Sequence, residues 1–299
     1  MLELESEKSR WNRVFDNIKS PLDKAITLSK GDFYLVNAIK ISNPIGGGEI
    51  MINYFMEKWK ECKSQESPNK IKQVRAILAD EESKKVLDAR IEVYETGNIS
   101  PLQKIKTDRM QYFNEEILSL SDNEIFIDLG AYQGDTIDSF IQHVKGKYKK
   151  IIAFEPDQET MLKLNRYILE KNINNVVVYK MASWNKKDIL KFREEGSFIS
   201  QISDMGTSSI NANSLDNVLF DVVQATFIKM DIEGAELKTI EGAENIIKKY
   251  RPKLAICVYH KADDIFEIPL AIKKLVPEYK LYLRQHSDSL LDTVLYATL

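Results

Sequence analysis

Residues 124–136 of this 299-residue chain read EIFIDLGAYQGDT, and this stretch decides the fold class. Residues 125–127 form a short apolar run of strand-forming residues, which ends at Asp128. Such a run is typical of a strand buried on both faces of a parallel sheet. A tight turn with two glycines, Gly130 and Gly134, follows it. A strand that runs into a glycine turn indicates the opening unit of a nucleotide-binding α/β fold.

A helix is predicted directly after this turn. Asp135 or Thr136 can cap it, because a short side-chain oxygen there accepts a free backbone N–H. Apolar residues then recur three to four apart from Ile137 to Val144, as on the buried face of a helix. In the turn itself, glycine would let the backbone approach a ligand closely, because no Cβ stands in the way.

The turn favours one class of cofactor. A dinucleotide site needs G-x-G-x-x-G, whereas here the glycines are four apart and follow an acid. A carboxylate repels a diphosphate and attracts an ammonium group, such as that of S-adenosylmethionine. This argues against an NAD-dependent oxidoreductase, although a turn without any ligand is an open alternative. The turn residues expected to contact S-adenosylmethionine are Asp128, Gly130, Ala131, Tyr132, Gly134, Asp135 and Thr136.

Two further segments extend the predicted cofactor site. Residues 149–155 read as the second strand and end in Glu155, an acid placed to hold both ribose hydroxyls. The third strand is predicted over residues 175–181. Ala182 and Ser183 follow it and are candidates to lie beside the adenine, with an ordinary strand exit as the alternative.

A lysine interrupts the fourth predicted strand, residues 227–230. Because burying an unpaired ammonium group is costly, Lys229 needs a carboxylate partner or a position at the strand mouth. Asp231 lies two residues on and therefore on the same side of the strand. Glu233 follows in the turn, before a helix over residues 237–250. Lys229 and Asp231 are therefore predicted to be functional.

His260 closely follows the fifth predicted strand, residues 253–258. Ligands of doubly wound sheets bind at the carboxyl ends of the strands, where Asp128, Glu155, Asp231 and His260 should therefore meet. A histidine with a pKa in the neutral range can serve there as a base. The alternative is a divalent metal held by Asp231, Glu233 and His260, which is not favoured.

The chain divides near residue 105. Residues 1–104 show helical spacing without strand–helix alternation, and residues 105–299 alternate between the two. We expect the first part to be a helical extension that covers the site or forms a homodimer contact. A small β-insertion is predicted over residues 188–215. Within the extension, helices are predicted over residues 1–30, 49–62 and 70–96.

Composition limits the partners. The net charge of -3 gives no basic field, which argues against nucleic acid. No apolar stretch approaches the ~20 residues of a membrane span, and the polar start does not resemble a signal peptide. The two cysteines form no ligand or disulfide pattern. A cytoplasmic protein that acts on a small-molecule or glycan acceptor is therefore expected.

Four segments carry a resemblance to a known family. Residues 126–136, 153–157, 227–236 and 251–260 resemble the FkbM-type S-adenosylmethionine-dependent methyltransferases. The resemblance implies a class I methyltransferase fold, which is a Rossmann-like, doubly wound α/β sheet with a closing antiparallel hairpin. It also implies methyl transfer to oxygen, often on sugars or polyketide-like products.

The resemblance assigns roles to single residues. It implies that Asp128, Gly130, Gly134 and Glu155 hold the cofactor and that Lys229, Asp231, Glu233 and His260 surround the methyl transfer. The prediction is an O-methyltransferase that acts on a hydroxyl of a sugar, glycan or related secondary metabolite. His260 or Asp231 would be the base, and Lys229 would orient the carboxylate or stabilise oxyanion charge. The alternative from another class is a non-catalytic binding or scaffold module, which the intact acids disfavour.

Overall fold

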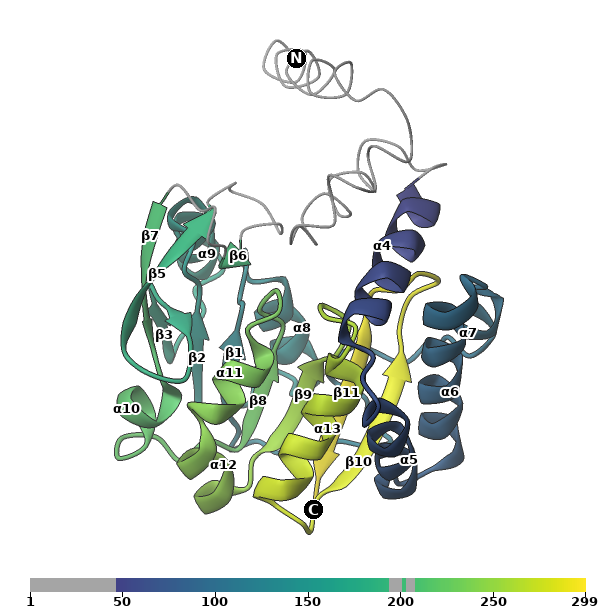
Figure 1. Cartoon of the computed structure of the whole chain (residues 1–299). Helices are drawn as coiled ribbons and strands as arrows, with labels where there is room; N and C mark the ends of the chain where they lie inside the picture. Colours follow the sequence, from purple (N-terminus) through teal and green to yellow (C-terminus); the bar gives the residue numbers. More distant parts are fainter. Residues whose placement is uncertain (1–46, 194–200, 203–207) are drawn as a thin grey trace, which may run out of the picture.

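Figure 1 shows the fold in a computed structural model, which describes residues 47–193, 201–202 and 208–299. The helix predicted over residues 1–30 lies outside the described residues, as does part of the insertion predicted over residues 188–215. In the described part, helices α11, α12 and α13 lie in front of a large sheet and α8 lies behind it (Figure 1).

The large sheet has seven strands in the order β10-β11-β9-β8-β1-β2-β3. They are β1 (Ile125–Leu129), β2 (Lys150–Phe154), β3 (Val176–Tyr179), β8 (Phe227–Met230), β9 (Lys253–Cys257), β10 (Lys280–Gln285) and β11 (Thr293–Thr298). Strand β11 is antiparallel to β9 and β10, and the other neighbours pair in parallel. The predicted doubly wound sheet with a closing antiparallel hairpin is confirmed. Its strand order reverses between β1 and β8, where ligands of such sheets bind.

The centre of the sheet is buried on both faces, as its apolar runs predict. Every residue of β1 and β8 is buried. Phe126 of β1 stacks on Phe227 of β8 with ring centroids 5.0 Å apart, and on Phe140 of α8 at 4.5 Å. These rings fix the two central strands against the helix that follows the glycine turn.

Ten helices lie within the described residues. They are α4 (Gly47–Cys62), α5 (Ser67–Ile77), α6 (Glu81–Thr96), α7 (Ser100–Lys104), α8 (Asp135–His143), α9 (Gln158–Glu170), α10 (Leu215–Leu219), α11 (Glu236–Glu241), α12 (Glu244–Tyr250) and α13 (Asp264–Leu275). Over these residues, no helix combines the length and the apolar character that a membrane crossing needs.

Two of the predicted helices are each divided into two. The helix predicted over residues 70–96 breaks after Ile77, because Leu78 forms a β-bridge with Leu281 of β10. The helix predicted over residues 237–250 breaks at Gly242. A Cβ at Gly242 would lie 2.0 Å from the Trp184 carbonyl oxygen, so a distant segment fixes this break.

The insertion forms a second, four-stranded sheet in the order β4-β7-β5-β6. Its strands are β4 (Ala182–Ser183), β5 (Asp188–Arg193), β6 (Gln201–Ile202) and β7 (Ser208–Asn213). This confirms the predicted β-insertion and shows that it begins earlier, at β4.

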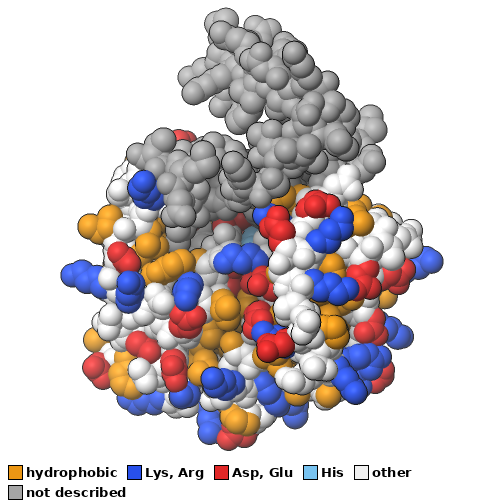
Figure 2. All heavy atoms as spheres, in the orientation of Figure 1, with side chains coloured by type: hydrophobic (Ala, Val, Ile, Leu, Met, Phe, Trp, Pro, Cys, Tyr) orange, Lys and Arg blue, Asp and Glu red, His pale blue; other side chains and the backbone are white. Residues whose placement is uncertain are grey.

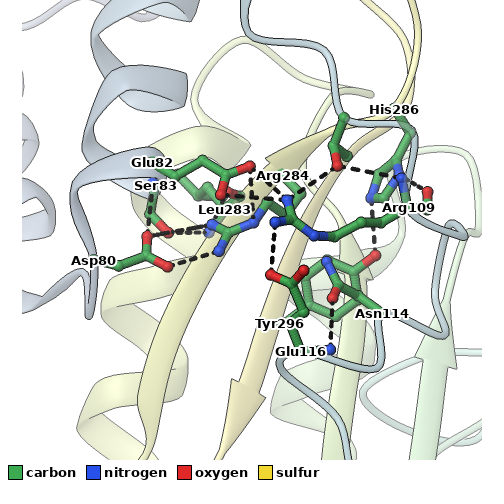
Figure 3. Close-up of polar contacts among 11 residues, drawn as sticks. Asp80, Glu82, Ser83, Arg109, Asn114, Glu116, Leu283, Arg284, His286 and Tyr296 are labelled. Carbon is green, nitrogen blue, oxygen red and sulfur yellow. Dashed lines mark hydrogen bonds and ion pairs between the residues drawn. The ribbon is translucent and has the colours of Figure 1, made fainter.

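The N-terminal helices are attached to the edge of the large sheet by buried charge (Figure 3). Arg284 of β10 is 3% exposed, and its Nη2 lies 2.6 Å from Asp80 Oδ2 at the start of α6. Its Nε lies 3.3 Å from Glu82 Oε1, and Arg109 Nη1 reaches the same carboxylate oxygen at 3.1 Å. Helices before residue 105 and strands after it therefore share one polar network.

Candidate active site

The glycine turn between β1 and α8 packs against the turn after β8. Gly130 has φ +76°, and a Cβ there would lie 1.9 Å from the Asp231 carbonyl oxygen. Gly134 has φ +97°, and a Cβ there would lie 2.6 Å from the Tyr167 ring. The space beside each glycine is thus filled by the protein itself, which corrects the prediction that this space receives a ligand.

Helix α8 begins at Asp135, with Gly134 at its N-cap. No side chain among the described residues caps it. The predicted cap at Asp135 or Thr136 is therefore wrong by one position: both residues already lie inside the helix, and the left-handed glycine makes the turn into it.

Glu155 joins the glycine turn to the end of β2. Its Oε2 accepts the Tyr132 N–H at 3.0 Å, and its Oε1 accepts the Asp157 N–H at 3.0 Å. The residue is 6% exposed, and this burial raises the pKa of Glu155 to about 7 even though both hydrogen bonds act to lower it. The carboxylate therefore lies where the prediction needs it, at the carboxyl end of the second strand.

Asp128 and Lys229 form an ion pair between β1 and β8. Lys229 Nζ lies 3.0 Å from Asp128 Oδ1, with both side chains almost fully buried. The same Nζ donates to the Gly130 carbonyl oxygen at 2.7 Å. Burial raises the pKa of Asp128 to about 6, although Lys229 acts to lower it. Asp128 is the carboxylate partner that Lys229 requires, so the ammonium it holds belongs to the chain, and its contact with a cofactor stays a prediction.

Asp231 is held at the end of β8 by two tyrosines. Its Oδ2 accepts the Tyr112 hydroxyl at 2.8 Å, and its Oδ1 accepts the Tyr259 hydroxyl at 3.1 Å. Burial disfavours the charged form, but His260 and Lys229 outweigh it and keep the pKa of Asp231 below its usual value. Sequence reasoning missed Tyr112, which lies 119 residues away with left-handed φ of 67° and belongs to no motif.

Three carboxylates surround His260. Its Nδ1 lies 2.8 Å from Glu236 Oε1, and its Nε2 lies 3.3 Å from Asp231 Oδ1 and 3.6 Å from Glu233 Oε2. Burial acts to lower the pKa of His260, but Glu236 and Glu233 raise it well above 6.5. The free protein therefore holds an imidazolium at neutral pH, and the predicted neutral-range pKa is wrong because these acids lie so close.

Glu233 and Glu236 differ in their surroundings. Glu233 has a left-handed φ of 54°, and burial, reinforced by Asp231 and Glu236, raises its pKa to about 8. Glu236 is fully buried, and its Oε1 also accepts the Ile232 N–H at 3.0 Å. From the sequence, Glu236 is explained by its place at a helix N-terminus, so its contact with His260 was missed.

The same cluster offers a set of metal ligands. One ligand atom each from Asp231, Glu236 and His260 lies within 4.8 Å of the other two. Glu236 thus takes the place that the sequence gives to Glu233. Carboxylate oxygens and an imidazole nitrogen are ligands that several divalent metals accept. The metal alternative therefore has candidate ligands, and whether it holds stays a prediction.

Ala182 and Ser183 form strand β4 of the small sheet. Ser183 is buried, and its Oγ lies 3.0 Å from the Thr239 Oγ1 of α11. This hydroxyl contact connects the small sheet to a helix of the large one. The predicted position of both residues beside an adenine stays a prediction.

The strand ends together form an acidic cluster. Carboxylates outnumber the cationic side chains that contact them, Lys229 and His260, among the described residues of this region. The carboxylates are those of Asp128, Glu155, Asp231, Glu233 and Glu236. An excess of buried acid favours a ligand that carries positive charge.

Comparison with known protein families matches residues 128–289 to the methyltransferase FkbM domain. This range covers more than half of the chain and contains all four acidic or basic strand ends described above. The chain belongs to the FkbM methyltransferase family. The family resemblance predicted from the four sequence segments is therefore confirmed.

Solved structures share the fold of this FkbM-family chain. A crystal structure of methyltransferase FkbM from Methylobacillus flagellatus KT is 25% identical and has a TM-score of 0.71, over 82% of this chain and 62% of that one. This chain thus spans less than two thirds of that relative. An rRNA methylase from Streptococcus thermophilus is 17% identical, with a TM-score of 0.39, over 62% of this chain and 90% of that one. No curated protein matches the sequence.

Membership of the FkbM family implies S-adenosylmethionine as the cofactor, which supplies an electrophilic methyl group when bound. The donor set fits it, because the cluster of buried acids suits a cationic ligand. An ionised carboxylate has about four acceptor sites, and two backbone N–H groups use only part of the capacity of Glu155. Glu155 is therefore the residue best placed to hold the ribose hydroxyls.

Proposed function

We propose that this FkbM-family protein is an S-adenosylmethionine-dependent O-methyltransferase that acts on a hydroxyl of a sugar, glycan or related secondary metabolite. The position of His260 carries the proposal: its Nε2 lies 3.3 Å from Asp231 Oδ1, at the strand ends beside the glycine turn. A hydroxyl is a weak nucleophile and gains from a base that removes its proton. Oxygen methylation is the reaction for which such a base is most useful.

The chain's residues would contribute mainly by alignment. Displacement at a methyl group requires the acceptor oxygen to approach in line, so fixed geometry supplies much of the rate. The Tyr112 and Tyr259 hydroxyls fix the Asp231 carboxylate, and Asp231 in turn lies next to the His260 ring. Lys229 is almost fully buried, which favours a positioning role for it over direct contact with an oxyanion.

His260 is the proposed base, and its neighbours set its strength. Neutral His260 would take the acceptor proton at Nε2, and Glu236 at Nδ1 would stabilise the imidazolium that forms. The same acids keep the ring protonated in the free protein, so turnover should rise with pH as His260 loses its proton. Asp231 is the weaker candidate, because a carboxylate with a lowered pKa binds protons poorly.

The test is transfer of labelled methyl groups by the purified full-length chain. Incubation with methyl-labelled S-adenosylmethionine and a glycan and metabolite extract should give methyl ethers, identified by mass spectrometry. His260→Ala should lower the rate by about 100-fold or more and leave S-adenosylmethionine binding intact. Label on nitrogen or sulfur would contradict the proposal, and cofactor binding without any transfer would favour the scaffold module.

Removal of metal decides the remaining alternative. Because His260 and the carboxylates provide a base without a metal, EDTA should leave turnover unchanged. Loss of turnover with EDTA and recovery with Mg²⁺ or Mn²⁺ would show instead that Asp231, Glu236 and His260 hold a metal.

We also infer the kind of partner from the charge of the molecule. The net charge is -3, and on the face in Figure 2 acidic and basic side chains are mixed without a large basic patch. Nucleic acid binding needs a concentrated basic surface. A small-molecule or glycan acceptor and a cytoplasmic location therefore stay our proposal, as does a homodimer through the N-terminal helices.

A further inference from the structure

A cavity of about 300 Å³ lies between helix α4 and the loop after β9. Helix α4 contributes one wall and residues 260–263 contribute the other. The lining residues on which the inference depends are Tyr54, Lys58, Glu61, His260, Lys261 and Asp263. His260, the proposed base, thus belongs both to the acidic cluster and to this cavity.

Aromatic contacts hold the α4 wall in place. Phe55 is fully buried and stacks on Tyr94 of α6, with ring centroids 5.8 Å apart. Trp59, one turn later, contacts the Phe266 ring of α13 edge-on at 6.1 Å. These two anchors fix α4 between the N-terminal helices and the methyltransferase domain, so the cavity is a built feature of the fold.

The charges that line the cavity are balanced. Lys58 Nζ lies 2.7 Å from Glu61 Oε2, and Lys261 donates to the Gly234 carbonyl oxygen. Asp263 adds a second carboxylate on the loop side. Two lysines and two acids give no preference for a charged ligand, but they offer both donors and acceptors beside the Tyr54 ring. Such a combination suits a neutral polyhydroxylated ring, whose C–H face packs on an aromatic side chain.

We propose that this cavity binds the methyl acceptor, a neutral sugar-like ring, and that α4 determines the specificity. The inference rests on the proposed function, because an acceptor hydroxyl must come within hydrogen-bond reach of the base. The α4 wall lies outside residues 128–289, which match the FkbM domain. The methyltransferase domain therefore supplies the chemistry, and the N-terminal extension supplies the recognition of the acceptor.

Saturation-transfer NMR on the full-length chain tests this inference, with neutral methyl glycosides of glucose, galactose and rhamnose as probes. At least one should bind, and Tyr54→Ala should weaken it at least fivefold. Tyr54→Phe should retain the binding, because the ring is kept. Lys60→Ala, an exposed position on the same helix that does not line the cavity, should leave it unchanged.

Calorimetry with S-adenosylmethionine on the same variants separates the two proposals. Unchanged cofactor affinity in Tyr54→Ala, together with weakened glycoside binding, supports α4 as the acceptor wall. Equal glycoside binding by Tyr54→Ala and the wild type, binding of charged sugars such as glucuronate alone, or no glycoside binding at all would overturn the inference. Each of these results leaves the proposed function standing if the cofactor binds, whereas loss of cofactor binding in the wild type contradicts the function itself.

Discussion

At the scale of single residues, the buried pair of Asp128 and Lys229 connects the two central strands. Both charges are removed from water, and their attraction offsets that loss only while both are present. The lysine also binds the carbonyl oxygen of Gly130. The pair is therefore better understood as a device that positions the glycine turn than as a source of net stability.

Removal of one partner should be more harmful than removal of both. Lys229→Met leaves a buried unpaired carboxylate and should lower the free energy of unfolding by about 3–5 kcal/mol. The double variant Asp128→Asn/Lys229→Met should recover more than half of this loss, because no buried charge is left. Urea unfolding of the three proteins checks it, and a double variant as unstable as Lys229→Met would refute the pairing.

A second prediction concerns the protonation of His260. Glu236→Gln removes the negative charge nearest to Nδ1, so the pKa of His260 should fall toward its ordinary value. The imidazolium contributes stability below the unfolded pKa, and this stability is lost as pH rises through the raised folded pKa. The variant should therefore lose this contribution at lower pH than the wild type.

NMR titration of the imidazole measures this shift directly, and the chain contains only 3 histidines to assign. Glu241→Gln, in an exposed pair with Lys238 on the same helix, is the matched control. An unchanged midpoint in Glu236→Gln would mean that Glu236 does not set the charge of His260.

Residue types at the strand ends predicted much of the cluster, because an acid or a lysine at the end of an apolar run needs a partner or a ligand. The partner itself could not be predicted. Asp128 meets Lys229 because β1 and β8 are neighbours, which is a property of the sheet order. Tyr112 reaches Asp231 from a segment without periodicity or motif, so no local signal points to it.

At the scale of elements, two turns hold each other in position. The Asp231 N–H donates to the Leu129 carbonyl oxygen at 3.2 Å, and the Asp231 carbonyl oxygen occupies the space beside Gly130. The turn after β1 and the turn after β8 are thus in backbone contact. A change of side chain in one turn should therefore disturb the other.

Two glycines with the same backbone conformation test this contact. Gly130 has φ +76° and Gly146 has φ +75°, but a Cβ at Gly146 would meet no described atom within 4 Å. Gly146→Ala should cost only the strain of a left-handed residue, about 1–2 kcal/mol. Gly130→Ala should cost more and also weaken cofactor binding, because the Asp231 backbone must move. Thermal unfolding and calorimetry compare them, and equal losses would contradict the account.

Helix and strand positions followed from local periodicity, whereas helix breaks did not. The break after Ile77 depends on a bridge between Leu78 and Leu281, and the break at Gly242 depends on the backbone of Trp184. Both partners are distant in the sequence. A pattern that repeats every three to four residues carries no information about such contacts.

At the scale of the whole molecule, the N-terminal helices are part of the same body as the sheet. The Ala79 N–H donates to the Leu281 carbonyl oxygen at 2.8 Å, and the buried Arg90 guanidinium donates to the Leu290 carbonyl oxygen at 2.7 Å. The Asp80–Arg284 pair adds buried charge at the same edge, and hydrogen bonds from Arg284 and Ser83 bring the pKa of Asp80 to about 2 despite its burial. The predicted boundary near residue 105 therefore does not mark the end of these contacts.

Arg284→Met should loosen this attachment (Figure 3). The change leaves Asp80 and Glu82 without a buried partner and should lower the free energy of unfolding by about 3 kcal/mol. Hydrogen exchange should rise first in α6. Arg75→Met, which removes an exposed pair with Asp88, should leave stability nearly unchanged. Equal exchange in the two variants would contradict a shared body.

The central claim is that the acids at the strand ends hold a positively charged methyl donor, and one calorimetric titration tests it most directly. S-adenosylmethionine titrated into the full-length chain should bind in the micromolar to millimolar range that enzymes use. Glu155→Gln should weaken it about tenfold or more, because a charged hydrogen bond to the donor is lost, whereas the exposed control Glu159→Gln should not. No heat at millimolar donor, or equal affinity in Glu155→Gln and the wild type, would contradict the account.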